Sequence, residues 1–141
     1  MMNELYNQRI LKLAGNIEHI GHLEAPAAQS DAVSRLCGSK VHVELSLDDG
    51  KVSAFAHQVE TCALGQASSA VMARQIIGST PDELREIGQQ MRAMLKQDGP
   101  PPSGRWQDLE VLQSVKEFKN RHASTLLTFD AVEACLADLG V

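Results

Sequence analysis

The chain has 141 residues, 43% of them apolar, which suffices for one domain with its own core and is too short for two ordinary ones. A net charge of −5 and an aromatic content of only 4% argue against a nucleic-acid-binding protein, which needs basic patches or stacking platforms. We therefore expect a single domain over residues 1–141 that binds no nucleic acid.

The apolar stretches span only a few residues, far below the roughly 18 that a membrane span needs, and the N-terminus lacks the order of a signal peptide. These features predict a cytoplasmic protein without membrane contact. The three cysteines are an odd number, and a reducing compartment favours thiol or metal chemistry over a disulfide framework.

The first half of the chain predicts a helix followed by strands. Apolar residues at helical spacing over residues 6–17 predict a helix of about three turns. An Ala-rich stretch gives a weak strand signal at residues 32–36. Apolar and polar residues alternate over residues 41–47, residues 49–50 are the Asp-Gly of a tight turn, and residues 52–59 form the returning strand.

The second half predicts helices. A helix of small side chains runs from Leu64 to near Gly78, and its composition suits a central, buried position. Residues 81–96 form an amphipathic helix with a hydroxyl cap and an early proline. A Pro-rich loop follows, then a short helix around Trp106 and a final one over residues 127–139. The fold class is therefore α+β, with a small antiparallel sheet of about three strands packed against helices.

Cys37 and Cys62 flank the predicted hairpin. Because the chain leaves along one strand and returns along the other, both thiols are expected at one end of the sheet. Cys62 also begins a helix, where the positive end of the dipole favours a thiolate. The alternative is that each is a small buried hydrophobe. Cys135 lies on an apolar helix stripe and is interpreted as core packing.

His122 precedes the last helix, whose first turn Ser124 and Thr125 can cap. A neutral imidazole is a good ligand for iron or zinc, and two thiolates with one imidazole form a partial coordination set. The alternative is a surface or capping residue.

The other four histidines show no ligand-like spacing to a cysteine. His42 is expected to be solvated on the polar face of its strand, and His57 shares a face with Phe55 and Val59 and is interpreted as structural. His19 and His22 receive no role.

Several segments resemble a known family. Residues 5–10 (LYNQRI), the Leu36-Cys37-Gly38 turn and residues 59–71 (VETCALGQASSAV) resemble the iron–sulfur cluster assembly scaffolds of the IscU/NifU-N type. Residues 108–118 and Arg121 are similar to a segment of the SufU branch. The resemblance covers nearly the whole chain, and its most specific element is the cysteine followed by a helix of small residues. It implies an IscU/SufU-like fold.

The resemblance also implies a ligand set of three cysteines and an aspartate. The first two cysteines correspond to Cys37 and Cys62, whereas the aspartate position holds Ser39 and the third cysteine position holds Ser124. A neutral hydroxyl is a much weaker ligand for iron or zinc than a thiolate or carboxylate. The proline-containing chaperone motif of the IscU branch is absent, so that partner is not implied.

Three ways of accommodating these replacements remain open. His122 supplies a third donor, although it is displaced by one residue from the histidine that some members carry. Alternatively, a second subunit or a small thiol completes the set, or cluster binding has been lost and the fold serves a protein contact. We rank incomplete but real binding first.

The resemblance implies a scaffold or carrier, not an enzyme. It would bind iron, zinc or a nascent iron–sulfur cluster at Cys37 and Cys62, with His122 as auxiliary ligand and Ser39 and Ser124 as weak donors. Its partners would be a cysteine desulfurase and acceptor apoproteins. The alternatives are a metal-free module that docks on an assembly factor, and a carrier of persulfide sulfur on Cys62. The metal or cluster type and the existence of a homodimer stay open.

Overall fold

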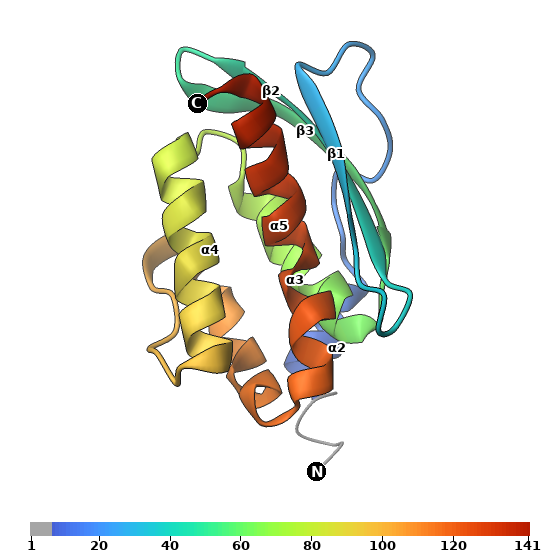
Figure 1. The fold of residues 1–141 in the computed structure, drawn as a ribbon, viewed down its shortest axis with the longest axis vertical. Helices are drawn as coiled ribbons and strands as arrows, with labels where there is room; N and C mark the ends of the chain where they lie inside the picture. Colours follow the sequence, from blue (N-terminus) through green and yellow to red (C-terminus); the bar gives the residue numbers. More distant parts are fainter. Residues whose placement is uncertain (1–6) are drawn as a thin grey trace.

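The computed structural model describes residues 7–141 and shows an antiparallel three-stranded sheet, in the order β1-β2-β3, packed against helices (Figure 1). This confirms the predicted α+β class. The elements in chain order are α2 (Gln8–Ala14), β1 (Ala28–Val33), β2 (Lys40–Asp48), β3 (Lys51–Glu60), α3 (Ala63–Gln75), α4 (Pro81–Lys96), the 3-10 segments η1 (Gly104–Glu117) and η2 (Lys119–Arg121), and α5 (His122–Leu139).

The predicted hairpin is confirmed as β2 and β3. Its two-residue turn places Asp49 at φ 54° and Gly50 at φ 74°, the positive values that such a turn requires. Val43 pairs with His57 and Leu45 with Phe55, so these side chains share the face that is turned to the helices. All four are buried. The alternation in the sequence therefore identified the inner face of the sheet.

The first strand lies earlier than predicted. The prediction of residues 32–36 is wrong at its end, because β1 spans Ala28–Val33 and Leu36 lies in the following turn with 72% of its surface exposed. The strand's position is set by its pairing with β2, where Ala28 faces Leu45 and Val33 faces Lys40. A short Ala-rich segment contains too little apolar contrast to indicate this register.

Two helices cover the inner face of the sheet. Helix α5 contacts β1 and β2, and α3 contacts β3 and α5, while α4 lies on the far side of α5 from the sheet (Figure 1). Along α3 the small side chains of Ala67, Ser68 and Ala70 are buried, which confirms its predicted central position. The core is continuous through these layers.

Helix boundaries differ from the predictions at several places. The first helix is two turns long, because Asn7 caps it by accepting from the Ile10 N–H and it ends before Gly15. Tyr6, predicted to begin it, lies outside the described residues. Helix α4 begins after Thr80, whose hydroxyl accepts from the Glu83 N–H, as predicted.

The helix predicted around Trp106 is a longer 3-10 segment, η1, and α3 ends at Gln75, before Gly78. No described helix is long and apolar enough to cross a membrane.

Candidate functional site

One end of the sheet collects the residues that the sequence singled out. Val33 pairs with Lys40 and Lys40 with Glu60, so the turn that carries Cys37 and the segment that carries Cys62 leave the sheet at the same end. The first turn of α5 begins at this end as well (Figure 1). The predicted convergence of three chain segments is present in the fold.

Cys37 lies in a compact turn between β1 and β2. The Ser34 N–H donates to the Ser39 carbonyl at 2.8 Å, and the Gly38 N–H donates to the Ser34 carbonyl at 2.8 Å. Gly38 has φ 73°, a value that glycine adopts without strain. This turn leaves the Cys37 thiol exposed.

Two hydroxyls meet the Cys37 sulfur. Sγ lies 3.5 Å from Ser34 Oγ and 3.1 Å from Ser39 Oγ. These hydrogen bonds, together with the Ser39 N–H, lower the pKa of Cys37, and the positive charge of Arg121 adds to the effect. The cause is that donors and a nearby cation favour the thiolate. Cys37 is therefore an exposed thiol whose pKa lies below its ordinary value.

Cys62 is the N-cap residue of α3 and is half-buried. Its carbonyl accepts from the Gln66 N–H at 3.0 Å, and its Sγ lies 3.5 Å from Ser124 Oγ on α5. The Ser124 side chain is buried and donates to the Arg121 carbonyl at 3.1 Å. The Cys62 sulfur and the Ser124 hydroxyl thus face each other across the α3–α5 contact.

Gly65 permits this close approach of the two helices. A Cβ atom at Gly65 would meet Thr61 Oγ1 at 2.5 Å and the Ser124 carbonyl oxygen at 2.8 Å. The second contact is with backbone, which a side-chain rotation cannot relieve. A residue without a side chain is therefore needed at this position to hold Cys62 against Ser124.

Comparison with known proteins assigns the chain to a family. The NifU-like N terminal domain family matches residues 5–125. A crystal structure of a nitrogen-fixing NifU-like protein (N-terminal) from Brucella abortus is 52% identical, with a TM-score of 0.96 over 99% of this chain and 96% of that one. The chain belongs to the NifU-like N-terminal domain family.

Two proteins of lower sequence identity also resemble this chain. A putative iron–sulfur cluster assembly scaffold for the SUF system from the thermophile Fervidobacterium islandicum AW-1 shares the fold at 23% identity, with a TM-score of 0.87 over 96% of this chain and 99% of that one. The iron–sulfur cluster assembly scaffold protein IscU of Streptococcus pyogenes serotype M1 is 22% identical over 135 residues, 96% of this chain and 84% of that protein. The family is thus one of iron–sulfur cluster assembly scaffolds, which are not enzymes in the usual sense.

The two positions at which this chain has a serine in place of a family ligand, Ser39 and Ser124, are adjacent to the two thiols. Ser39 Oγ contacts Cys37 Sγ, and Ser124 Oγ contacts Cys62 Sγ. The resemblance assigned the aspartate position to Ser39 and the third cysteine position to Ser124. The structure brings each serine to the thiol that such a ligand would accompany, but with a hydroxyl in place of a carboxylate or thiolate.

His122 is not brought to the thiols. It is the first residue of α5 and not a residue outside the helix, as was expected. Its ring is buried, and Nε2 donates to the carbonyls of Val115 at 3.1 Å and Lys116 at 3.2 Å, on the side of η1. Among the described residues, His122 and the cysteines form no group of three or more ligand atoms close enough to share an ion. The predicted auxiliary role requires the ring to move.

The expected capping of α5 by hydroxyls is also wrong. Ser124 and Thr125 lie inside the first turn, and both hydroxyls donate back to the Arg121 carbonyl. Arg121 is the N-cap residue and makes no side-chain capping bond. The first-turn N–H groups of α5 therefore receive no side-chain cap from these hydroxyls.

Cys135 is a core residue, as interpreted. It is fully buried, and burial raises the pKa of its thiol to about 11. His57 is buried as well, with Nε2 donating to the Glu18 carbonyl at 2.8 Å, in agreement with a structural role. Burial lowers the pKa of His57, which favours the neutral form of the ring.

The expectation for His42 is wrong. Its side chain is only 18% exposed and lies between two carboxylates, those of Asp31 and Glu44. His22 contacts the same Glu44. The sequence carried one usable signal, the His42-x-Glu44 spacing, which places both side chains on one face of a strand. The contribution of His22, from a loop twenty residues away, had no such signal.

Proposed function

We propose that this chain is a scaffold or carrier in iron–sulfur cluster assembly. The Cys37 and Cys62 thiolates hold iron, zinc or a nascent cluster as cargo and pass it to acceptor apoproteins. The observation that carries the proposal is the pairing of each thiol with a family ligand position at one end of the sheet: Cys37 with Ser39, and Cys62 with Ser124. Thiolates are the preferred ligands of such metals.

The donor set is incomplete, and this affects how the cargo is held. Two thiolates leave a tetrahedral ion without two of its ligands. Ser39 and Ser124 act as weak donors or hydrogen-bond to the thiolates, and a small thiol or a second copy of the chain fills the open positions. His122 contributes only if it gives up its bonds to Val115 and Lys116. Such loose binding favours a carrier that releases its cargo readily.

The same thiols can accept sulfur from a cysteine desulfurase. In this step the terminal sulfur of the desulfurase persulfide bonds to the attacking thiolate, and the desulfurase cysteine leaves as a thiolate. The exposure and lowered pKa of Cys37 favour attack by this residue. Cys62 was the candidate from sequence alone. Mass spectrometry after incubation with a desulfurase and cysteine, followed by peptide mapping, identifies which thiol gains the mass of sulfur.

Reconstitution without oxygen tests the cargo role. The protein is incubated with ferrous iron and sulfide under anaerobic conditions, desalted, and analysed for metal and for the visible absorption of a cluster. Cys37→Ser and Cys62→Ser should each lose most of the bound iron. Cys135→Ala is the matched control, because this thiol is buried in the core, and it should retain wild-type loading. Equal loading of all four proteins would refute the assignment.

A metal-free docking module is the second candidate, and the hydroxyls at positions 39 and 124 favour it. In that case the wild-type protein binds a cysteine desulfurase but takes up no iron, zinc or cluster after reconstitution. Pull-down and calorimetry with purified desulfurase, run beside the metal analysis, separate the two functions. A cytoplasmic location agrees with the carrier role, because a carrier needs reduced thiols.

A further inference from the structure

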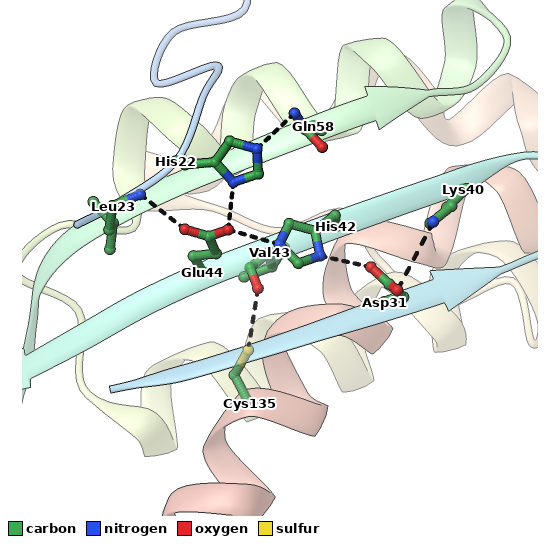
Figure 2. Close-up of polar contacts among 9 residues, drawn as sticks. All are labelled: His22, Leu23, Asp31, Lys40, His42, Val43, Glu44, Gln58 and Cys135. Carbon is green, nitrogen blue, oxygen red and sulfur yellow. Dashed lines mark hydrogen bonds and ion pairs between the residues drawn. The ribbon is translucent and has the colours of Figure 1, made fainter. Parts of the chain in front are cut away.

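A second group of potential ligands lies on the outer face of the sheet. We call it the histidine cluster and define it as His22, His42 and Glu44, with Asp31 and Gln58 at its edges (Figure 2). Among the described residues it is the only group of three or more His, Cys, Asp or Glu ligand atoms that could hold one ion, all lying within 4.8 Å of one another.

The fold brings these residues together in two ways. His42 and Glu44 are two apart on β2 and point to the same face, opposite the buried face of Val43. His22 comes from the segment between α2 and β1. That segment is fastened to the sheet by the Gly21 N–H, which donates to the His57 carbonyl at 3.0 Å, and by the Leu23 N–H, which donates to Glu44 Oε1 at 2.8 Å.

Both imidazoles meet at a single carboxylate oxygen. His22 Nδ1 lies 2.6 Å from Glu44 Oε2, and His42 Nε2 lies 2.8 Å from the same oxygen. An ion at about 2.0–2.1 Å from each donor in a tetrahedral site separates neighbouring donors by roughly 3.3 Å. Each contact therefore has to lengthen by less than 1 Å to admit an ion, a change that side-chain rotation can supply.

Glu44 is a buried anion that lacks a permanent positive partner. Its side chain is 5% exposed, and its ion-pair partners among the described residues are His22 and His42 alone. Lys40 is paired instead with Asp31, at 3.8 Å. A carboxylate removed from water needs a compensating cation, and an imidazole provides one only when it is protonated.

We propose that the histidine cluster binds a divalent first-row transition-metal ion, with His22 Nδ1, His42 Nε2 and Glu44 Oε2 as ligands. Two imidazoles and a carboxylate are a donor set that suits zinc and ferrous iron. This site contains no thiol and is separate from Cys37 and Cys62. The proposal for this site does not depend on the cargo role proposed for Cys37 and Cys62.

The surrounding groups are arranged as those of a metal site. Asp31 Oδ1 lies 2.6 Å from His42 Nδ1, on the ring nitrogen that faces away from the ion. A carboxylate in this position fixes the tautomer and orientation of a ligating histidine. The Leu23 N–H does the same for the free oxygen of Glu44, so the two more buried ligands are held in place before an ion arrives.

Ion binding rearranges two protons. In the metal-free cluster His42 donates to carboxylates from both nitrogens, and His22 Nδ1 donates to Glu44. The incoming ion displaces the proton of His42 Nε2 to solvent, and the proton of His22 moves from Nδ1 to Nε2. In the metal-free structure the Gln58 amide nitrogen lies 3.0 Å from His22 Nε2. Once His22 Nε2 carries the proton, the Gln58 amide rotates so that its oxygen accepts from this nitrogen.

The remaining coordination positions are open to solvent. The His22 side chain is 59% exposed, and His42 and Gln58 line a hollow of about 460 Å³ together with Lys40 and Glu60. Water or a small anionic ligand can therefore complete the coordination shell. An ion held by three protein ligands at such an accessible place exchanges with the medium.

Metal binding by a variant that lacks the two thiols at the end of the sheet tests this proposal. The parent is Cys37→Ser/Cys62→Ser, stripped with chelator and titrated with Zn²⁺ in equilibrium dialysis. We expect one ion per chain. His22→Ala removes the most exposed ligand with little risk to folding, and Glu44→Gln keeps the shape of the shared ligand. His19→Asn is the matched control, because His19 is exposed on the same segment and lies outside the cluster.

The expected result is a loss of at least tenfold in zinc affinity for His22→Ala and Glu44→Gln, with a change below twofold for His19→Asn. Zinc should raise the Tm of the parent and leave that of Glu44→Gln unchanged. Cobalt bound to the parent should show visible d–d bands without thiolate charge-transfer absorption. Absence of a bound ion in the parent, or equal affinities for His22→Ala and His19→Asn, would overturn the proposal.

Discussion

The two ligand-rich regions of this molecule differ in how their donors are held. The thiols are carried by a turn and a helix start, and each contacts mainly a neutral hydroxyl: Cys37 meets Ser39, and Cys62 meets Ser124. The histidine cluster is built largely on adjacent strands, and its members are linked by charged hydrogen bonds.

This difference indicates different uses. Turns and helix ends accommodate movement, which suits the role proposed for the thiols, the binding and release of a cargo that changes size as it assembles. Side chains fixed on a sheet and braced by neighbouring groups suit one ion at a defined place. The same small domain therefore presents one adaptable and one preorganised set of ligands.

The largest effect is expected from restoring the family's donors at the thiol end. The Ser39→Asp/Ser124→Cys variant adds a carboxylate beside Cys37 and a thiolate beside Cys62. Iron or zinc affinity should rise by about 100-fold, because each added ligand contributes on the order of tenfold or more. Competition with a chromogenic chelator measures the change. An unchanged affinity would mean that the two thiols do not act as one site.

The next effect concerns acid stability at the histidine cluster. Burial alone would raise the pKa of Glu44, but hydrogen bonds from His22, the Leu23 N–H and His42 hold it at about 2, below its ordinary value of 4.5. A depressed carboxylate pKa contributes stability that is present above about pH 4.5 and is lost as the pH falls towards 2.

Glu44→Gln should therefore lower the free energy of unfolding of the metal-free protein by about 2 kcal/mol at neutral pH. The difference from wild type should shrink as the pH falls through 4.5 towards 2. Urea unfolding in the presence of chelator, repeated across this range, provides the measurement. A constant difference at every pH would show that the charge of Glu44 is not the cause.

A smaller effect, on the free energy of unfolding, is expected from a substitution at the contact between α3 and α5. Gly65→Ala places a Cβ within 2.8 Å of the Ser124 carbonyl oxygen, which forces the helices apart. Overpacking costs about 1–3 kcal/mol and the helix propensity of alanine returns roughly 1, so we expect a net destabilisation of about 1 kcal/mol. Thermal unfolding measures it.

Gly88→Ala is the comparison for Gly65→Ala. Gly88 is a helical glycine on α4 whose added Cβ would have the ends of the Glu133 and Arg92 side chains as its nearest neighbours. It should cost less stability and leave metal retention at the thiols unchanged, whereas Gly65→Ala should reduce both. The reverse order would contradict the role given to the α3–α5 contact.

The smallest effect concerns the reactivity of Cys37. Hydrogen bonds with Ser34 and Ser39 lower the pKa of this thiol. Ser34→Ala should raise that pKa and slow alkylation of Cys37 a few-fold near neutral pH, because less thiolate is present. Peptide mapping after iodoacetamide treatment measures the rate, with Ser30→Ala as a control on β1.

The parts of the fold that sequence predicted are those with local causes. The alternation of Val41 and Val43 and the Asp49-Gly50 turn define the hairpin without reference to the rest of the chain, and Thr80 with Pro81 defines the start of α4. The end of the sheet that carries both thiols followed directly from the hairpin.

The parts that were missed depend on distant contacts. The register of β1 is set by β2, and the start of α5 at His122 is not marked by any capping side chain. The histidine cluster needs β1, β2, β3 and the segment around His22 to be in place together, so no short stretch of sequence contains it. The position of the His122 ring was not predictable from the sequence, because its backbone partners, Val115 and Lys116, are brought to it only by the tertiary fold.

Because Cys135 is buried, the reactivity of its thiol reports whether the protein is folded. A colorimetric sulfhydryl reagent added to the folded, cargo-free chain should titrate the two accessible thiols and pass over the third, which reacts only once α5 separates from β2. The number of reactive thiols before denaturant is added, compared with the number after, gives the folded fraction of a preparation in one measurement. Variants that keep the three native thiols, such as Gly65→Ala and Gly88→Ala, can be checked in this way before their metal content is interpreted.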